Sequence, residues 1–187
     1  MRFVLLGEPD ADDLRAPGYR KVRVLLAYLL MEPPRAHRRD TLAELLWEDL
    51  PLDAARARLR RMLFVLRDAV GDPAAAVPLL RIGRDVVQLD PRRPVEVDAR
   101  RLLESEPQPA DHDGAAALAA IVGLYRGPFL DGCGEDDADT ALGAWLTHCR
   151  RVLHAAQADR LKALYRFHRA AGELRQAAEF ARHLTVL

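Results

Sequence analysis

The chain has few of the features that place a protein outside the cytoplasm. Its 187 residues include only two cysteines, Cys133 and Cys149, which are too few for a disulfide framework. There is no run of about 18 uncharged apolar residues to span a membrane, and the apolar run at residues 3–6 is too short for a secretion signal. We therefore expect a soluble cytoplasmic protein that has no contact with a membrane.

Motifs that carry catalysis are also missing. The sequence contains no phosphate-binding loop, no dinucleotide-binding glycine pattern, and no plausible order of serine, histidine and aspartate for nucleophilic catalysis. The chain is therefore predicted not to be an enzyme, and no cofactor is expected.

The residue types that bind metals occur without the spacing that a metal requires. The nearest approach to a zinc-binding set consists of Cys133, His148, Cys149 and His154. The two histidines are six residues apart, on opposite sides of a helix, and there is no paired-cysteine motif. The acidic residues between positions 131 and 139 lack the alternating oxygen ligands and the terminal glutamate of a calcium loop. No metal site is expected.

Charge of one sign does not dominate the chain, because 28 basic residues balance 28 acidic ones. The charges are unevenly placed: residues 1–94 hold 17 basic and 14 acidic residues (+3), whereas residues 95–187 hold 11 and 14 (−3). Only Lys21 and Lys162 are lysines, and the excess of arginine fits a GC-rich bacterial genome as well as it fits phosphate binding. The basic surface is expected in the first half of the chain.

The most informative segment is residues 55–67, which holds five arginines and no acidic residue. Its apolar residues recur at helical spacing, and one narrow sector of the helix contains Leu59, Leu63, Leu66 and Val70. This stripe is expected to pack on a core, which leaves a cationic surface around it. The helix is either an ordinary amphipathic helix with solvated arginines or one that binds phosphate, and the neighbouring segments decide between the two.

The segments before the arginine-rich one predict a strand and two helices. A short strand at residues 2–7 and a loop or weak hairpin at residues 8–18 open the chain. A helix then begins near Arg20 and stops before Pro33, because proline disfavours helix in the residue that precedes it. Residues 41–44 have capping-box spacing, which predicts a short second helix.

The arginine-rich helix is expected to cover residues 52–70 and to be followed by a hairpin. Apolar strands at residues 79–82 and 86–89 are separated by a turn signal with Arg84 at its tip. Strand, three helices and hairpin is the order of a winged helix-turn-helix. We therefore predict a DNA-binding domain of this kind at residues 1–94.

Beyond residue 94 the pattern changes to helices only. Periodicity predicts these at residues 98–104, 113–125, 140–170 and 173–187. Prolines and glycine at residues 107–114 predict a flexible connection. The last two helices resemble a tetratricopeptide pair in the small residues near their turn. Because one such pair cannot bury its own faces, we expect residues 95–187 to be an incomplete helical domain of a longer protein. The predicted fold class is α+β, mainly α.

Several strings of the sequence resemble a known family. Residues 20–30, residues 42–47 (Leu-Ala-Glu-Leu-Leu-Trp) and the arginine-rich helix resemble the OmpR-type winged helix that opens the Streptomyces antibiotic regulatory protein (SARP) class of transcriptional activators. The bacterial transcriptional activator domain (BTAD) follows in that class, and residues 95–98, 124–132 and 145–146 resemble it. The most specific of these strings is Tyr-Arg-Gly-Pro-Phe-Leu, which starts at Tyr125. The resemblance covers nearly the whole chain.

The resemblance implies a DNA-binding transcriptional activator. Its third helix would enter the major groove of double-stranded DNA, while the hairpin would touch the adjacent backbone or minor groove. The DNA contacts that it implies are all arginines: Arg38 and Arg39 between the first two helices, Arg56, Arg58, Arg60 and Arg61 on the third helix, and Arg84 on the hairpin. Most of them would neutralise phosphate rather than read bases. The activator domain is implied to form a homodimer and to contact RNA polymerase or another regulatory protein.

Two pairs of residues depart from the family pattern. The family usually carries amide-rich polar residues where this chain has Ala57 and Arg58, and basic or polar residues where it has Phe64 and Val65. Amides read adenine, whereas arginine pairs with guanine. On the helical wheel Phe64 and Val65 point away from the core stripe, which indicates a protein interface. The alternative function is therefore a winged-helix regulatory or protein-interaction module of a larger signalling protein that has lost sequence-specific DNA binding.

Overall fold

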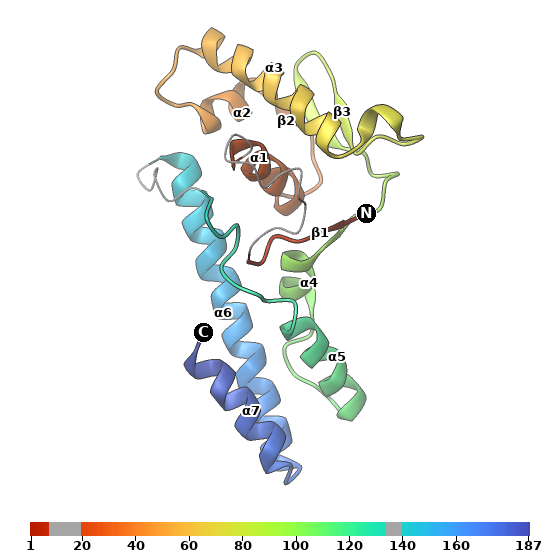
Figure 1. The fold of residues 1–187 in the computed structure, drawn as a ribbon, viewed down its shortest axis with the longest axis vertical. Helices are drawn as coiled ribbons and strands as arrows, with labels where there is room; N and C mark the ends of the chain where they lie inside the picture. The colour runs from red at the N-terminus through yellow and green to blue at the C-terminus, as the bar shows by residue number, and fades with distance from the viewer. Residues whose placement is uncertain (8–19, 134–139) are drawn as a thin grey trace. The chain divides into compact units, whose positions relative to one another are not determined.

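The structure is a computed structural model that describes residues 1–7, 20–133 and 140–187 (Figure 1). Seven α-helices and five short strands lie within these ranges. The predicted loop at residues 8–18 lies outside the described residues, as do the acidic residues at positions 135–139. Within the described ranges, no helix is both long enough and apolar enough to cross a membrane.

The chain forms two compact units, and each contains segments that are far apart in the sequence. Unit 1 consists of the described residues of Met1–Arg2, Pro9–Val95 and Gly132–Thr147, and unit 2 of those of Phe3–Glu8, Glu96–Asp131 and His148–Leu187. Helix α6 (Ala141–Ala170) contributes residues to both units. The predicted domains, residues 1–94 and 95–187, are continuous in sequence and stay a prediction.

Unit 1 contains three helices, α1 (Arg20–Met31), α2 (Arg39–Leu46) and α3 (Leu52–Ala69). Their apolar stripes form its core, in which the following side chains are at most 2% exposed: Leu25, Leu29, Leu42, Leu59, Leu63 and Leu66. Helix α1 ends before Pro33, as predicted. The chain turns after α3 at Gly71, whose φ of 68° would strain a residue with a side chain. The predicted first helix and the predicted arginine-rich helix are thus confirmed.

The start of α2 differs from the prediction. The helix begins at Arg39, and no side chain caps it. The backbone N–H of Arg39 donates instead to the carbonyl of Asp85 in the hairpin, at 2.8 Å. The predicted capping box at residues 41–44 is wrong because a contact that is distant in sequence already satisfies a donor at the start of the helix.

The predicted hairpin is confirmed, and a third strand extends it into an antiparallel sheet. β3 (Leu80–Ile82) pairs with β4 (Val86–Leu89), which pairs in turn with β2 (His37–Arg38). The register places Ile82 opposite Val87, and Val87 on the middle strand is fully buried. The hairpin is therefore held within unit 1 through its second strand, which pairs with β2.

A buried carboxylate holds the base of this hairpin. Asp72, in a single 3-10 turn after α3, is 3% exposed and accepts hydrogen bonds from the backbone N–H groups of Leu79 and Leu80. Nη1 of Arg93 donates to the same carboxylate at 2.9 Å. One side chain thus fixes where β3 begins relative to the end of α3.

The predicted strand at residues 2–7 is shorter in the structure. β1 covers only Arg2–Phe3 and pairs with β5 (Glu96–Val97), a strand in the part of the chain where the sequence predicted helices only. The backbone N–H groups of residues 5 and 6 donate to the carboxylate of Asp98, at 2.9 and 3.1 Å. Because the carboxylate accepts these two hydrogen bonds in place of a neighbouring strand, β1 ends at Phe3.

Unit 2 is helical apart from these strands. Its helices are α4 (Asp98–Glu104), α5 (His112–Val122), α7 (Leu174–Thr185) and the larger part of α6. One buried apolar cluster contains Ala115, Leu118, Val122, Leu161, Ala163 and Leu164, with Phe180 and Leu184 of α7 packed against it. The turn between α6 and α7 contains Gly172 at a φ of 77°. The predicted helix pair at the end of the chain is present.

Helix α5 begins inside the connection that was predicted to be flexible, residues 107–114. The carboxylate of Asp111 accepts a hydrogen bond from the N–H of Gly114 at 2.8 Å, which is the bond that an N-cap makes. The helix therefore starts at His112 and also ends earlier than predicted, at Val122.

A carboxylate at the turn between α6 and α7 bonds two histidines. Glu173 contacts Nδ1 of His168 at 2.5 Å and Nε2 of His112 at 2.9 Å. These hydrogen bonds, first the one from His168 and then the one from His112, lower the pKa of Glu173. The three side chains connect the start of α5 with the turn that joins α6 to α7.

This lowered pKa predicts a specific acid sensitivity. Because the pKa of Glu173 is lower in the folded protein than in the unfolded chain, its stabilising effect is present above the unfolded value of about 4.3 and is lost as the pH falls through the folded value. We expect the melting temperature, followed by circular dichroism over an acid pH series, to fall more steeply for the unmodified chain than for Glu173→Gln. Glu179→Gln, an exposed glutamate of α7, should behave like the unmodified chain. Equal slopes in all three proteins would contradict the assignment.

Candidate nucleic-acid interface

Helix α3 presents two faces of opposite character. Its buried stripe contains the four predicted residues, each at most 4% exposed: Leu59, Leu63, Leu66 and Val70. Its other side carries exposed residues, among them Arg58, Arg60, Arg61 and Phe64. The predicted amphipathic division of this helix is confirmed.

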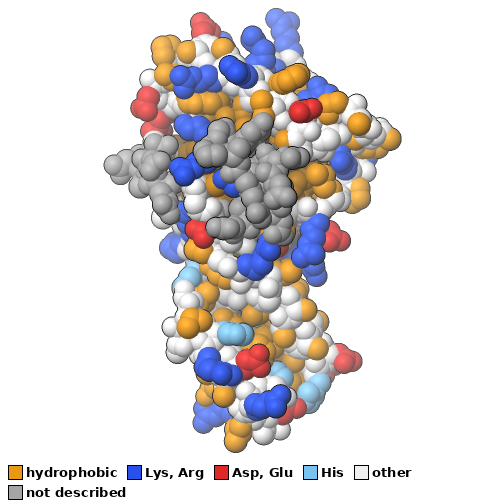
Figure 2. All heavy atoms as spheres, in the orientation of Figure 1, with side chains coloured by type: hydrophobic (Ala, Val, Ile, Leu, Met, Phe, Trp, Pro, Cys, Tyr) orange, Lys and Arg blue, Asp and Glu red, His pale blue; other side chains and the backbone are white. Residues whose placement is uncertain are grey.

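Three arginines of the exposed face have no acidic partner in the part of the chain that the structure describes. The side chains of Arg58, Arg60 and Arg61 form no ion pair and no hydrogen bond with another described residue. Figure 2 shows lysine and arginine side chains over the region that Figure 1 labels α2 and α3. A guanidinium group can donate two parallel hydrogen bonds to a phosphate, so these side chains are suited to an anionic partner.

Arg56 differs from the other arginines of α3 because it is paired within the fold. Its Nε and Nη2 donate to the two carboxylate oxygens of Asp40, at 2.7 and 2.8 Å, and its Nη1 donates to Asp53 at 3.3 Å. The hydrogen bond between them lowers the pKa of Asp40 and raises that of Arg56. Because Asp40 belongs to α2, the pair joins α2 to α3. Arg56 stays a predicted DNA contact, but its charge is already balanced.

The remaining predicted arginines lie around the hairpin. Arg38 is exposed on β2, and Arg84 is exposed in the turn between β3 and β4. Nη1 of Arg39 donates to the carbonyl of Gly83, at 3.3 Å, next to Arg84 in the chain. The structure thus brings Arg39 and the hairpin turn together, as expected for a wing beside the start of α2.

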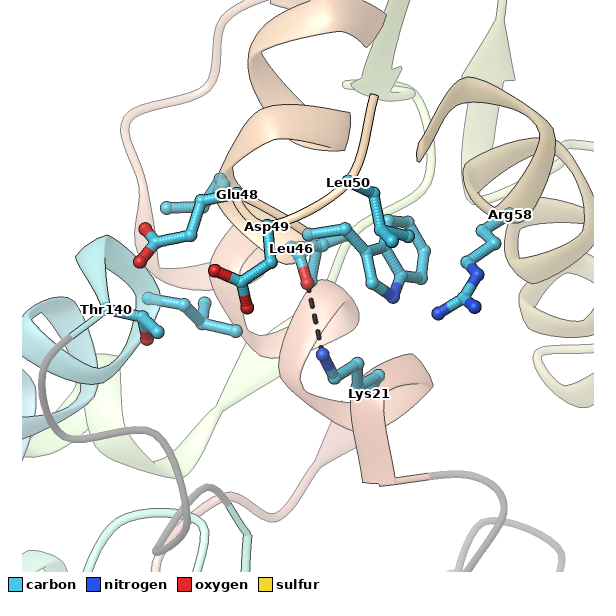
Figure 3. A pocket seen from close by; sticks show the side chains of 10 residues that line it. Lys21, Leu46, Glu48, Asp49, Leu50, Arg58 and Thr140 are labelled. Carbon is cyan, nitrogen blue, oxygen red and sulfur yellow. Dashed lines mark hydrogen bonds between the residues drawn. The ribbon is translucent and has the colours of Figure 1, made fainter. Parts of the chain in front are cut away.

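A pocket of about 190 Å³ beside α3 adds a cation that the sequence patterns did not indicate (Figure 3). Lys21 of α1 and Arg58 of α3 both line this pocket, and in Figure 3 the ammonium group of Lys21 points toward the carbonyl of Leu46. Nζ of Lys21 donates to the carbonyl of Leu46 at 3.1 Å and lies 5.8 Å from the ring centre of Trp47, within cation–π range. The one sequence signal for Lys21 is that lysine is rare in this chain, which has only two.

The same pocket also has an acidic side. Glu48 and Asp49 lie toward Thr140 in Figure 3, away from Arg58. Oε2 of Glu48 accepts a hydrogen bond from the N–H of Ala141 at the start of α6, at 3.1 Å. The carboxylate of Glu48 therefore has a partner in the fold.

Phe64 stands among cations on the exposed face of α3. Its side chain is 75% exposed, as predicted, whereas Val65 is half-buried. Arg60 and Arg61 precede Phe64 by one helical turn, and Arg67 follows it by one turn. Three exposed arginines and one exposed aspartate, Asp68, thus lie within one helical turn of Phe64.

The cysteines and histidines considered for zinc do not form a site. Among the residues that the structure describes, no group of three or more His, Cys, Asp or Glu side chains is arranged to hold a metal ion. His148 contacts Arg151, and His154 contacts the carbonyl of Leu187, each at 3.3 Å.

Three helices followed by a hairpin make unit 1 a winged helix-turn-helix, and with its helical partner unit the fold is α+β and mainly α, as predicted. No family model matches the chain, and no curated protein matches it. The solved structure of Mycobacterium tuberculosis EmbR in complex with a low-affinity phosphopeptide is similar, with a TM-score of 0.53 and 23% sequence identity. The similarity covers 96% of this chain and 54% of the EmbR chain, so this chain spans about half the length of EmbR. It shows a shared fold.

Proposed function

We propose that the chain is a DNA-binding transcriptional regulator, an activator of the SARP type, whose helix α3 enters the major groove of double-stranded DNA. The observation that carries the proposal is the exposed face of α3, where Arg58, Arg60 and Arg61 have no acidic partner among the described residues. DNA presents a dense row of phosphates on each side of the groove, and guanidinium groups bind phosphate well. The fold shared with EmbR supports a regulatory function.

Other cations extend the proposed interface beyond α3. Arg38, Arg39 and Arg84 contact the DNA backbone beside the hairpin, and Lys21 contacts it beside α1. Arg56 contributes less, because its guanidinium already binds two aspartates. These contacts fix the register of the helix on the duplex, while the outermost side chains of α3 face the base edges.

Unit 2 supplies the contacts with other proteins in this proposal. It forms the homodimer and binds RNA polymerase or another regulatory protein. The phosphopeptide in the EmbR structure supports a protein contact in that protein, of which this chain spans about half. The protein acts in the bacterial cytoplasm by binding and not as an enzyme.

A titration of the chain with double-stranded DNA fragments tests the proposal. Affinity is expected to fall with salt on a log–log plot with a slope of about −4 to −6, as that many neutralised phosphates release their counterions. Fluorescence anisotropy at several salt concentrations measures the slope. The proposal fails if no fragment is bound even at low salt.

One observation favours a second function. Phe64 is 75% exposed on the same helix, and an exposed aromatic side chain is typical of protein interfaces. In this case the winged helix is a regulatory or protein-interaction module of a larger signalling protein. The two functions differ in what Phe64 contacts, which is a base in the first and another protein in the second.

A further inference from the structure

We infer that Phe64 is a specificity-determining residue that reads thymine, its ring contacting the C5-methyl group of a thymine in the major groove. The inference rests on the proposed function, because it requires α3 to lie in the groove. It assigns base recognition to a helix that has no asparagine or glutamine, the amide side chains that read adenine.

The position of Phe64 on α3 is the first support. The ring is 75% exposed and lies on the side of the helix away from the buried stripe. Ala57 is exposed two turns earlier on the same face. Its short side chain allows the helix backbone to approach the floor of the groove closely. Phenylalanine is one of the side chains that make apolar contact with the thymine methyl group.

The charges around Phe64 favour a polyanion over a second copy of the chain. Within one turn of Phe64, α3 carries Arg60, Arg61 and Arg67 but only one acidic residue, Asp68. Two copies of this face would bring arginines against arginines, which is unfavourable. One ring and one alanine also expose far less apolar surface than the roughly 800 Å² that each partner contributes to a stable interface.

Among polyanions, duplex DNA offers an apolar partner at the place where α3 would bring the ring. The helix has 18 residues and is therefore about 27 Å long at 1.5 Å per residue, and a helix of ordinary width fits the major groove. The thymine methyl is the apolar group that base pairs present in this groove. When the arginines beside it bind phosphate, the ring of Phe64 lies in the groove. Its most favourable contact there is the methyl group of thymine.

The test compares thymine with uracil, which lacks only the C5-methyl group. The duplex that the unmodified chain binds most tightly is selected from a random-sequence pool and is prepared with thymine or with uracil at every such position. We expect the uracil duplex to bind about fourfold more weakly for each contacted methyl, the factor that corresponds to about 0.8 kcal/mol per buried carbon group. Because an alanine side chain at position 64 is too short to reach the methyl group that the ring contacts, Phe64→Ala is expected to bind the two duplexes equally, and both as weakly as the unmodified chain binds uracil.

A matched control and four further outcomes make the test decisive. Leu174→Ala, which removes an apolar side chain that is 70% exposed on α7, should retain the preference for thymine. Equal binding of both duplexes by the unmodified chain, or a preference that persists in Phe64→Ala, overturns the inference and leaves the proposed function standing. Loss of self-association in Phe64→Ala at an unchanged thymine preference also overturns it, in favour of a protein interface. If no duplex is bound at low salt, the proposed function itself fails.

Discussion

Replacing Arg58, Arg60 and Arg61 together with alanine is expected to weaken DNA binding by about two to three orders of magnitude at ~0.1 M salt. Each of these side chains is exposed and lacks an acidic partner in the described part of the chain, so its charge is available to phosphate. Counterion release also predicts that the log–log salt slope becomes shallower by about 0.9 for each phosphate that is no longer neutralised. Anisotropy titrations over a salt series measure both effects.

The matched control for this variant replaces three exposed arginines of unit 2, Arg166, Arg175 and Arg182. Both variants change the net charge by the same amount, so the comparison separates a local contact from general attraction. Binding by the control should stay close to that of the unmodified chain. Equal losses in the two variants would mean that overall charge alone attracts DNA, and would contradict the placement of α3 in the groove.

Asp72→Ala is expected to lower the free energy of unfolding by about 3 kcal/mol. The substitution leaves the backbone N–H groups of Leu79 and Leu80 without their acceptor, and Arg93 without its carboxylate. Asp72 is 3% exposed, so water does not readily replace these bonds. Urea unfolding followed by circular dichroism should show a lower midpoint with an unchanged dependence on denaturant.

Asp68→Ala provides the comparison for this loss, because Asp68 is an exposed aspartate on α3 close to Asp72 in sequence. We expect it to change the free energy of unfolding by less than about 0.5 kcal/mol. If both variants unfold at the same urea concentration, the carboxylate of Asp72 does not hold the base of the hairpin in the way that the structure indicates.

The helices could be predicted because their signals are local. Apolar residues repeat at helical spacing along α1 and α3, and Pro33 and Gly71 mark where these helices stop. The start of α2 and the strand β5 could not be predicted in the same way. Both depend on partners that are distant in sequence, the carbonyl of Asp85 for the first and the first strand of the chain for the second.

The candidate site likewise has features that local sequence predicts and features that depend on contacts distant in sequence. The exposure of Arg58, Arg60 and Arg61 follows from the periodicity of one helix, and the sequence therefore predicted it. The pairing of Arg56 with Asp40 arises only when α2 packs on α3. That Lys21 and Arg58 line one pocket depends likewise on the packing of α1 near α3, and no motif in the sequence indicates either arrangement.

The hydrogen bond from the N–H of Arg39 to the carbonyl of Asp85 widens the choice of residues that can begin α2. Helices commonly have serine, threonine, aspartate or asparagine at the N-cap position, because these side chains accept hydrogen bonds from the first N–H groups of the helix. In this protein a backbone carbonyl of the hairpin, that of Asp85, accepts this hydrogen bond instead. The chain is therefore able to place two consecutive arginines, Arg38 and Arg39, where other helices need a cap. A position that ordinarily serves the stability of the helix becomes available for binding a ligand.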